Sequence, residues 1–183
     1  IRDMIAHCKD QMLTPEGFAK TVSMDNYEDR MYAQSYRMYQ EILGENDAMD
    51  FDDMILMTIK LFKQEPEVLA YYQNKFKYIL VDEYQDTNRA QYEFISLLAR
   101  EHHNLCVVGD DDQSIYSFRG ADISNILNFE KEYPETKVIK LEQNYRSTQP
   151  ILDVANCIIR NNAGRKGKKL WTDISEGELP RHY

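Results

Sequence analysis

The chain has 183 residues, which at roughly 100–200 residues per domain allows one domain, or one domain and part of another. Hydrophobic residues make up 43% of it, enough for a sizeable core, and 7 glycines and 5 prolines are too few for a collagen-like or low-complexity chain. The 22 basic and 31 acidic residues give a net charge of −9, which excludes a globally basic coat for nucleic acid but not a local basic groove.

We expect neither a membrane-spanning segment nor a signal peptide, because no stretch approaches the roughly 20 consecutive apolar residues that cross a bilayer. The three cysteines, Cys8, Cys106 and Cys157, are far apart and form no C-x-x-C pair, which argues against a disulfide scaffold or a zinc site. A reducing, cytoplasmic location is therefore expected. Neither Ile1 nor Tyr183 resembles a natural terminus, so we expect a piece excised from a longer protein.

Residues 1–45 are predicted to be helical. Thr14-Pro15-Glu16 is typical of a helix start, because a capping hydroxyl precedes a proline at the first helical position. Apolar residues then recur at helical spacing, and this stripe is expected to pack against neighbouring helices; it consists of Tyr32, Tyr36, Tyr39 and Leu43.

The clearest helix is predicted to begin after Asp50, where Asp52 and Asp53 favour the positive end of the helix dipole. Its apolar residues share one face, formed by Phe51, Met54, Ile55, Ile59 and Phe62. A further helix is predicted from Pro66 to about Phe76.

Three short apolar runs follow, and each is predicted to be a strand: 78–81, 105–108 and 138–141. Helical patterns at 90–98 and 123–129 separate them, and a last helix follows Pro150. Short strands that alternate with helices predict an α/β fold, with a parallel sheet flanked by helices and an all-helical N-terminal segment. The basic stretch from Arg165 to Lys169 could contact phosphate, but a solvated turn is the simpler expectation.

A polar cluster follows each predicted strand, at 82–86, 109–113 and 143–146. Because ligands of open α/β sheets bind beyond the carboxyl ends of the strands, we expect the three clusters to form one site. Asp82 and Glu83 directly follow an apolar strand, which is the Walker B pattern. Asp82 is a hard oxygen ligand suited to Mg²⁺, and Glu83 can deprotonate a water that attacks a γ-phosphate. The same pair also occurs where a strand simply ends in a solvated turn.

The other two clusters contain further groups that can contact phosphate. Gln113 can hydrogen-bond to a γ-phosphate, and Arg146 offers a planar guanidinium for a bidentate phosphate contact, beside Tyr145, whose ring can stack on a base. Taken singly, a loop amide that caps the backbone and a surface arginine beside a half-buried tyrosine would be the simpler interpretations.

Three segments together carry a resemblance: VDEYQDTN at 81–88, VGDDDQSIYSFRGA at 108–121 and LEQNYRST at 141–148. They closely resemble motifs II, III and IV of the UvrD/Rep/PcrA-like superfamily 1 DNA helicases. The resemblance includes DFDD at 50–53 and KKLWT at 168–172, and it implies a partial RecA-like (P-loop NTPase) fold. It divides the chain into the helical part of a 1B-like subdomain (1–48), the second half of the RecA-like 1A domain (49–147) and the start of a 2A-like domain (148–183).

The resemblance implies a role in ATP hydrolysis for five of these residues. Asp82 would bind the Mg²⁺ of Mg·ATP, and Glu83 would be the catalytic base. Gln113 would sense the γ-phosphate and link it to the DNA site. Tyr145 would stack on adenine, and Arg146 would contact the γ-phosphate as an arginine-finger-like group.

The resemblance also implies contacts with single-stranded DNA. Tyr116 and Phe118 would meet the bases, Arg119 would couple that site to the nucleotide, and Phe51 would be a further base-contacting ring. Phe118 replaces a tryptophan that is common in the family, which should weaken but not abolish stacking. Phe51 also lies on the apolar stripe of its helix, so burial in the core stays an equal alternative.

The Walker A pattern G-x-x-x-x-G-K-[ST] does not occur in the 183 residues. The family order would put it before residue 1 and the later motifs after residue 183. The resemblance therefore implies a parent ATP-dependent 3′→5′ DNA helicase that couples Mg·ATP hydrolysis to translocation on single-stranded DNA and to unwinding of duplex DNA. Without a phosphate cradle, the isolated chain is expected to be inactive.

Three alternatives stay open. The chain could be a non-catalytic single-strand-binding or regulatory module, for which Tyr116, Phe118 and Arg119 would matter. It could be a metal-dependent nuclease that uses Asp82, Glu83 and the acidic run 110–112 as a two-metal site, although residues 113–121 have no place in that mechanism. A subunit of a helicase–nuclease would show similar motifs.

Overall fold

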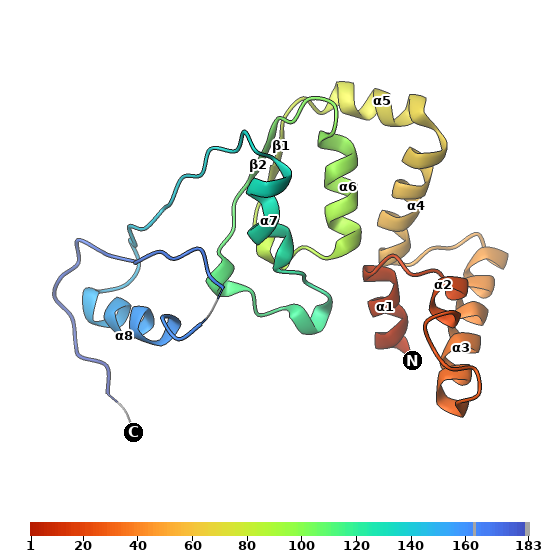
Figure 1. Cartoon of the computed structure of the whole chain (residues 1–183), viewed down its shortest axis with the longest axis horizontal. Helices are drawn as coiled ribbons and strands as arrows, with labels where there is room; N and C mark the ends of the chain where they lie inside the picture. Colours follow the sequence, from red (N-terminus) through yellow and green to blue (C-terminus); the bar gives the residue numbers. More distant parts are fainter. Residues whose placement is uncertain (163, 182–183) are drawn as a thin grey trace. The chain divides into compact units, whose positions relative to one another are not determined.

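The computed structural model describes residues 1–162 and 164–181, so Tyr183, at the end of the predicted 2A-like segment, lies outside the described residues (Figure 1). The described residues form α1 (Arg2–Asp10), α2 (Pro15–Ala19), α3 (Tyr27–Glu45), α4 (Phe51–Gln64), α5 (Pro66–Lys75), β1 (Ile79–Val81), η1 (Tyr84–Asp86), α6 (Arg89–Ala99), β2 (Leu105–Val107), η2 (Asp111–Gln113), η3 (Ser117–Arg119), α7 (Ser124–Glu132) and α8 (Gln149–Ile159). Among them, no helix combines the length and the apolar composition that crossing a bilayer requires.

The chain divides into two compact units, which are described separately. The first unit comprises residues 1–110 and 114–125, and the second comprises 111–113 and the described residues from 126 onward. The first unit contains the N-terminal helices and the sheet, and the second contains α7 and α8 for most or all of their length.

Local capping fixes where the predicted helices begin. The Thr14 hydroxyl accepts a hydrogen bond from the Gly17 amide at 3.1 Å, and Pro15 is the first residue of α2. Asp50 caps α4 by accepting from the Asp53 amide at 2.9 Å, while the Asp53 carboxylate accepts from the Asp50 amide at 3.3 Å. This reciprocal capping box confirms that Asp50 and Asp53 mark the start of α4.

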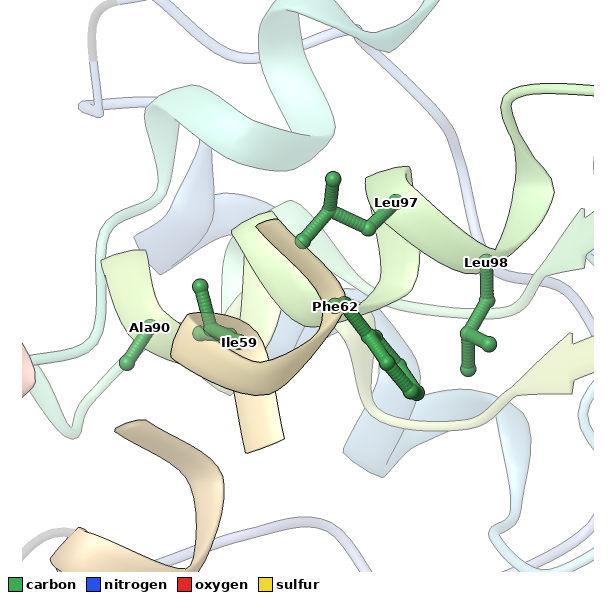
Figure 2. Packing of buried hydrophobic residues seen from close by; sticks show 5 residues of the cluster. All are labelled: Ile59, Phe62, Ala90, Leu97 and Leu98. Atoms are coloured by element: carbon green, nitrogen blue, oxygen red, sulfur yellow. The ribbon is translucent and has the colours of Figure 1, made fainter. Parts of the chain in front are cut away.

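The main core of the first unit lies between α4 and α6 (Figure 2). Its fully buried members are Ile59, Phe62, Ala90, Leu97 and Leu98. The ring of Phe94 stacks on Phe62, with centroids 6.1 Å apart. Burying side chains of this size stabilises a fold by about 1.5–3 kcal/mol each, so this contact fixes α6 on the helical part of the unit.

A smaller core lies between α1 and α3, where Ile5, Cys8 and Tyr36 are buried together. The Tyr36 hydroxyl donates to the carbonyl of Leu13 at 2.8 Å, and burial raises the pKa of this phenol. For Tyr36, the prediction that the tyrosine stripe packs against neighbouring helices is therefore confirmed.

The first two predicted strands are confirmed, and they pair in parallel. Ile79 lies opposite Leu105, and Val81 lies opposite Val107. Because α6 connects β1 to β2, the two strands and the helix make one βαβ unit, and the α/β fold with an all-helical N-terminal segment is confirmed.

The third predicted strand, at 138–141, is wrong. This stretch has no regular secondary structure in the second unit, and its Val138, Ile139 and Leu141 side chains are exposed. A single bridge joins Gln143 to Trp171 a little further along. The apolar composition suits a strand, but a strand needs a partner, and the described residues of this unit offer none to 138–141.

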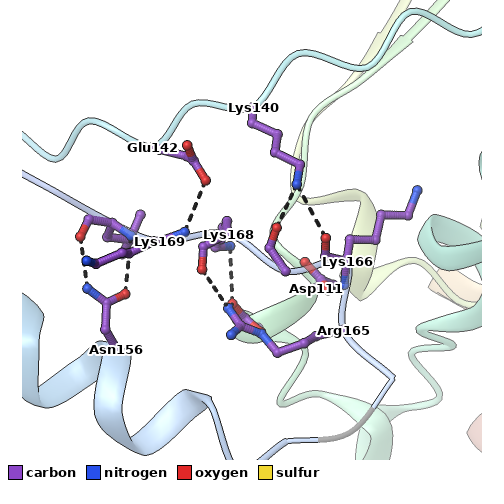
Figure 3. Close-up of polar contacts among 11 residues, drawn as sticks. Asp111, Lys140, Glu142, Asn156, Arg165, Lys166, Lys168 and Lys169 are labelled. Atoms are coloured by element: carbon purple, nitrogen blue, oxygen red, sulfur yellow. Dashed lines mark hydrogen bonds and ion pairs between the residues drawn. The ribbon is translucent and has the colours of Figure 1, made fainter.

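The second unit is held together largely by polar contacts (Figure 3). Arg165 makes a bidentate ion pair with Asp112, with its Nε 2.8 Å from Oδ1 and a terminal nitrogen 2.5 Å from Oδ2. Its side chain is only 16% exposed. The Lys166 amide donates to Asp111 at 2.8 Å, and Asn156 exchanges two hydrogen bonds with the backbone of Leu170. The expected solvated turn at 165–169 is therefore wrong for Arg165, whose charge is paired.

Candidate active site

The carboxylate pair lies where β1 ends. Asp82 and Glu83 are both exposed, and the Asp82 Oδ1 accepts a hydrogen bond from the Glu83 amide at 2.9 Å. Glu83 has φ 50° and ψ 42°, a left-handed conformation that is uncommon for a residue other than glycine. The backbone therefore turns sharply at Glu83 and leads its side chain away from the line of the strand.

Main-chain hydrogen bonds continue the pairing of β1 and β2 into this turn. The Val108 amide donates to the carbonyl of Val81 at 2.8 Å, and the Tyr84 amide donates to the carbonyl of Val108 at 2.9 Å. The turn after β1 is thus anchored on the chain that follows β2, as expected for loops at the carboxyl ends of parallel strands.

Gln85 is a functional candidate that the sequence analysis missed. Its side chain is 1% exposed, and its Nε2 donates to the Glu83 Oε2 at 2.8 Å. Its Oε1 accepts from the Asp110 amide at 2.9 Å. The sequence signal was an amide two residues after the carboxylate pair, but its partner Asp110 is 25 residues away.

The Asp82 carboxylate fits one ligand position of Mg²⁺. It is exposed, and only one of its oxygens accepts a hydrogen bond from the described residues. Mg²⁺ typically takes one or two protein carboxylates and keeps several waters, so a single accessible aspartate is sufficient.

The first unit also presents an aromatic cluster, which comprises Tyr116, Phe118 and Arg119. The two rings are tilted by 46° with centroids 6.0 Å apart, and the Arg119 guanidinium lies 5.4 Å from the Tyr116 centroid and 5.6 Å from that of Phe118. Phe118 is 75% exposed. Exposed rings beside a guanidinium form a surface on which nucleic acid bases can stack.

Gly120 ends the short helix η3 directly after this cluster. It has φ 82°, and a Cβ built on it would lie 2.6 Å from the Asp10 carboxylate of α1. Only glycine tolerates both the conformation and the close approach. Asp10 also accepts from the Asn88 side chain at 2.6 Å, so it joins α1 to the N-terminus of α6.

Phe51 is the first residue of α4 and is 88% exposed, so the alternative that it belongs to the core is wrong. The first turn around it is fixed, because the buried amine of Lys9 pairs with Asp50 at 2.6 Å and with Asp53 at 2.8 Å. The ring therefore projects from a rigid helix start.

Gln113, Tyr145 and Arg146 belong to the second unit, so the expected meeting of the three polar clusters stays a prediction. Gln113 is the last residue of η2. Tyr145 is 79% exposed, and its hydroxyl donates to Gln143 at 2.9 Å. Arg146 is exposed too, in a turn where the Asn144 side chain accepts from the Arg146 and Ser147 amides.

Comparison with known families agrees with these elements. The model of the UvrD/REP helicase N-terminal domain matches residues 1–134, and that of the UvrD-like helicase C-terminal domain matches residues 139–183. The chain belongs to the UvrD/REP helicase family, and the resemblance seen in the motifs is confirmed.

Its relatives include individual helicases of staphylococci. The chain is 56% identical over 179 residues to the ATP-dependent DNA helicase PcrA of Staphylococcus aureus (strain Mu50 / ATCC 700699) and 55% identical to that of Staphylococcus epidermidis (strain ATCC 12228 / FDA PCI 1200). Each alignment covers 98% of this chain but 24% of the relative. The chain thus spans about a quarter of the length of these relatives.

Proposed function

We propose that this chain is the motif II to IV part of an ATP-dependent 3′→5′ DNA helicase, which couples hydrolysis of Mg·ATP to translocation on single-stranded DNA and to duplex unwinding. The observation that carries the proposal is the exposed Asp82-Glu83 pair at the carboxyl end of a parallel strand in a chain of this family.

Asp82 and Glu83 perform different parts of the hydrolysis. Asp82 would hold Mg²⁺, which when bound neutralises phosphate oxygens. Glu83 accepts the proton of the attacking water, because its carboxylate is exposed and one oxygen is oriented by Gln85. Metal binding by Asp82 and proton transfer to Glu83 both require exposed carboxylates, and the turn after β1 exposes both side chains.

Gln113, Tyr145 and Arg146 complete the nucleotide site in this proposal. Gln113 contacts the γ-phosphate, and Arg146 balances the charge that develops there. Tyr145 stacks on adenine, which is supported by the exposure of its ring. These groups belong to the second and third polar clusters, and ATP would bring them to the first.

The aromatic cluster and Phe51 form the proposed contact with single-stranded DNA. Stacking on rings of this kind contributes roughly 1–3 kcal/mol per base and is independent of sequence. Arg119 lies over both rings of the cluster, so it can move with them when DNA binds and can pass that change to the nucleotide site. This coupling would allow DNA to stimulate ATP turnover.

We further propose that residues 1–48 are the helical part of the 1B-like subdomain, 49–147 the second half of the 1A domain and 148–183 the start of the 2A-like domain. The Walker A half, the rest of 2A and the 2B domain would belong to the parent protein. Because G-x-x-x-x-G-K-[ST] does not occur in the 183 residues, the isolated chain would not hydrolyse ATP.

The decisive experiment uses the full-length protein and its Glu83→Gln variant. We expect DNA-stimulated ATP turnover to fall by about 10²–10⁴-fold, because the variant lacks the base. The parent protein should unwind a duplex with a 3′ tail and leave one with a 5′ tail intact. Glu101→Gln, at an exposed glutamate after α6, is the matched control and should retain full activity.

Two results would contradict the proposal. One is full ATP turnover by the Glu83→Gln protein. The other is Mg²⁺-dependent and DNA-stimulated ATP turnover by the purified 183-residue chain that is lost in Glu83→Gln, because the chain would then need no Walker A loop.

A further inference from the structure

Gln85 is a fully buried amide beside the exposed carboxylate pair. At 1% exposure it is among the best-buried large side chains of the described residues. An amide in such a position is costly unless both its donor and its acceptor find partners. The identity of those partners therefore indicates why a glutamine is present.

Each end of the amide has a partner from a different turn. Its Nε2 donates to the Glu83 Oε2 at 2.8 Å and makes a longer contact of 3.4 Å with Asp86. Its Oε1 accepts from the Asp110 amide at 2.9 Å. The Gln85 side chain thus connects the turn after β1 to the turn after β2.

The hydrogen bond to Glu83 affects a side chain that is otherwise unconstrained. Glu83 is exposed and has three side-chain torsions, and among the described residues no other side chain bonds to its carboxylate. A donor on Oε2 selects one orientation of the group and leaves Oε1 for a water. A base that is held in one orientation reacts faster than one that samples many.

We propose that Gln85 is a positioning residue for ATP hydrolysis, which orients the Glu83 carboxylate and links it to the backbone of Asp110. The inference rests on the proposed role of Glu83 as the base. It extends that role, because the chain continues from Asp110 to the proposed sensor Gln113 only three residues later. A change at the sensor loop can therefore reach the base through one buried amide.

The test compares two substitutions in the full-length protein. Gln85→Leu removes both hydrogen bonds, and Gln85→Met removes them while nearly keeping the length of the side chain and adding no charge beside Glu83. We expect both to lower kcat for DNA-stimulated ATP hydrolysis by about 10²-fold, with the KM for ATP and the affinity for single-stranded DNA unchanged within about twofold. Because Gln85→Met is uncharged and nearly preserves the shape of the side chain, it serves if Gln85→Leu does not fold.

A matched control is Gln73, a half-buried glutamine of α5 whose Nε2 donates to the carbonyl of Leu97 at 2.8 Å. Gln73→Leu removes a structural hydrogen bond away from the carboxylate pair. It should lower the melting temperature and leave kcat unchanged. Loss of kcat at Gln73 equal to that at Gln85 would overturn the proposal, because any lost amide would then suffice.

A double-mutant cycle separates this inference from the proposed function. In a Glu83→Gln background, Gln85→Met should change kcat no further, since there is no base left to orient. If Glu83→Gln alone does not lower kcat, the proposed function fails. If Glu83→Gln lowers kcat but the Gln85 variants do not, or if the two losses multiply, only the positioning role is overturned.

Discussion

At the scale of single residues, the backbone conformation of Glu83 is unusual, and hydrogen bonds of the neighbouring residues stabilise it. A left-handed residue other than glycine costs of order 1–3 kcal/mol, and such residues persist only where their surroundings determine them. Here the Asp82 carboxylate accepts a hydrogen bond from the Glu83 amide. The next amide, that of Tyr84, donates a hydrogen bond to the carbonyl of Val108. The strained conformation ends the extended backbone of β1 at Glu83, the proposed catalytic base.

The aromatic cluster allows a prediction about DNA binding at the same scale. In the full-length protein, Phe118→Ala should weaken binding of an oligo(dT) by about 5- to 150-fold, because a stacked base contributes roughly 1–3 kcal/mol. The Phe118→Trp variant should bind the oligo(dT) at least as tightly as the unsubstituted protein. Fluorescence anisotropy at a fixed salt concentration measures these affinities.

The control for this prediction is Tyr71→Ala. Tyr71 is also an exposed ring beside a cation, with the Lys75 amine 5.7 Å from its centroid, but it lies on α5. It should not affect DNA binding. Equal losses for Phe118→Ala and Tyr71→Ala would mean that exposed aromatic surface in general, rather than the aromatic cluster, binds the strand.

At the scale of the elements, sequence predicted well wherever the cause of a structure is local. The starts of α2, α4 and α5 follow from Thr14, Asp50 and Pro66, because a cap or a first-turn proline acts within a few residues. The strand predicted at 138–141 failed because pairing depends on a distant partner.

The same distinction explains what was missed in the candidate site. The Asp82-Glu83 pair is a local motif and could be recognised from the sequence. The position of Gln85, in contrast, depends on a hydrogen bond from the amide of Asp110, which lies 25 residues later, after β2. Arg165 likewise forms its ion pair with Asp112, which is 53 residues away in the sequence. Periodicity also failed for Phe51, since it shows which face of a helix is apolar but not where along that face the packing ends.

Asp10 connects two elements and gives the first unit a pH dependence. Burial and the nearby charge of Asp52 raise its pKa from 3.8 to about 6. Between these values the folded chain binds more protons than the unfolded chain, so the contribution of Asp10 to stability falls as the pH rises from about 4 to 6. Above that range the carboxylate is charged in both states and its destabilising effect is complete.

We therefore expect Asp10→Asn to raise the melting temperature at pH 8 more than at pH 4. The variant keeps an oxygen that can accept from Asn88 but cannot ionise. Thermal unfolding of the chain at the two pH values measures the difference. Asp25→Asn, at an exposed turn residue, is the control and should show no such dependence on pH. A gain that is equal at both pH values would show that charge at Asp10 is not the cause.

At the scale of the whole molecule, the proposed machinery is distributed over two units. The first unit contains the carboxylate pair, Gln85 and the aromatic cluster, and the second contains Gln113, Tyr145 and Arg146. With a net charge of −9, the proposed binding of phosphate and DNA would depend on local groups such as Arg119 and Arg146 rather than on an overall attraction. We propose that ATP brings the two sets of groups into one site.

The most direct measurement is an experimental structure of the full-length protein with Mg²⁺ and a non-hydrolysable ATP analogue. We expect the Asp82 carboxylate at the metal, the Glu83 carboxylate beside the γ-phosphate with its hydrogen bond to Gln85 intact, and Gln113 and Arg146 within hydrogen-bonding distance of that phosphate. A bound nucleotide that contacts Asp82 while Gln113 and Arg146 lie on another face of the protein would contradict it.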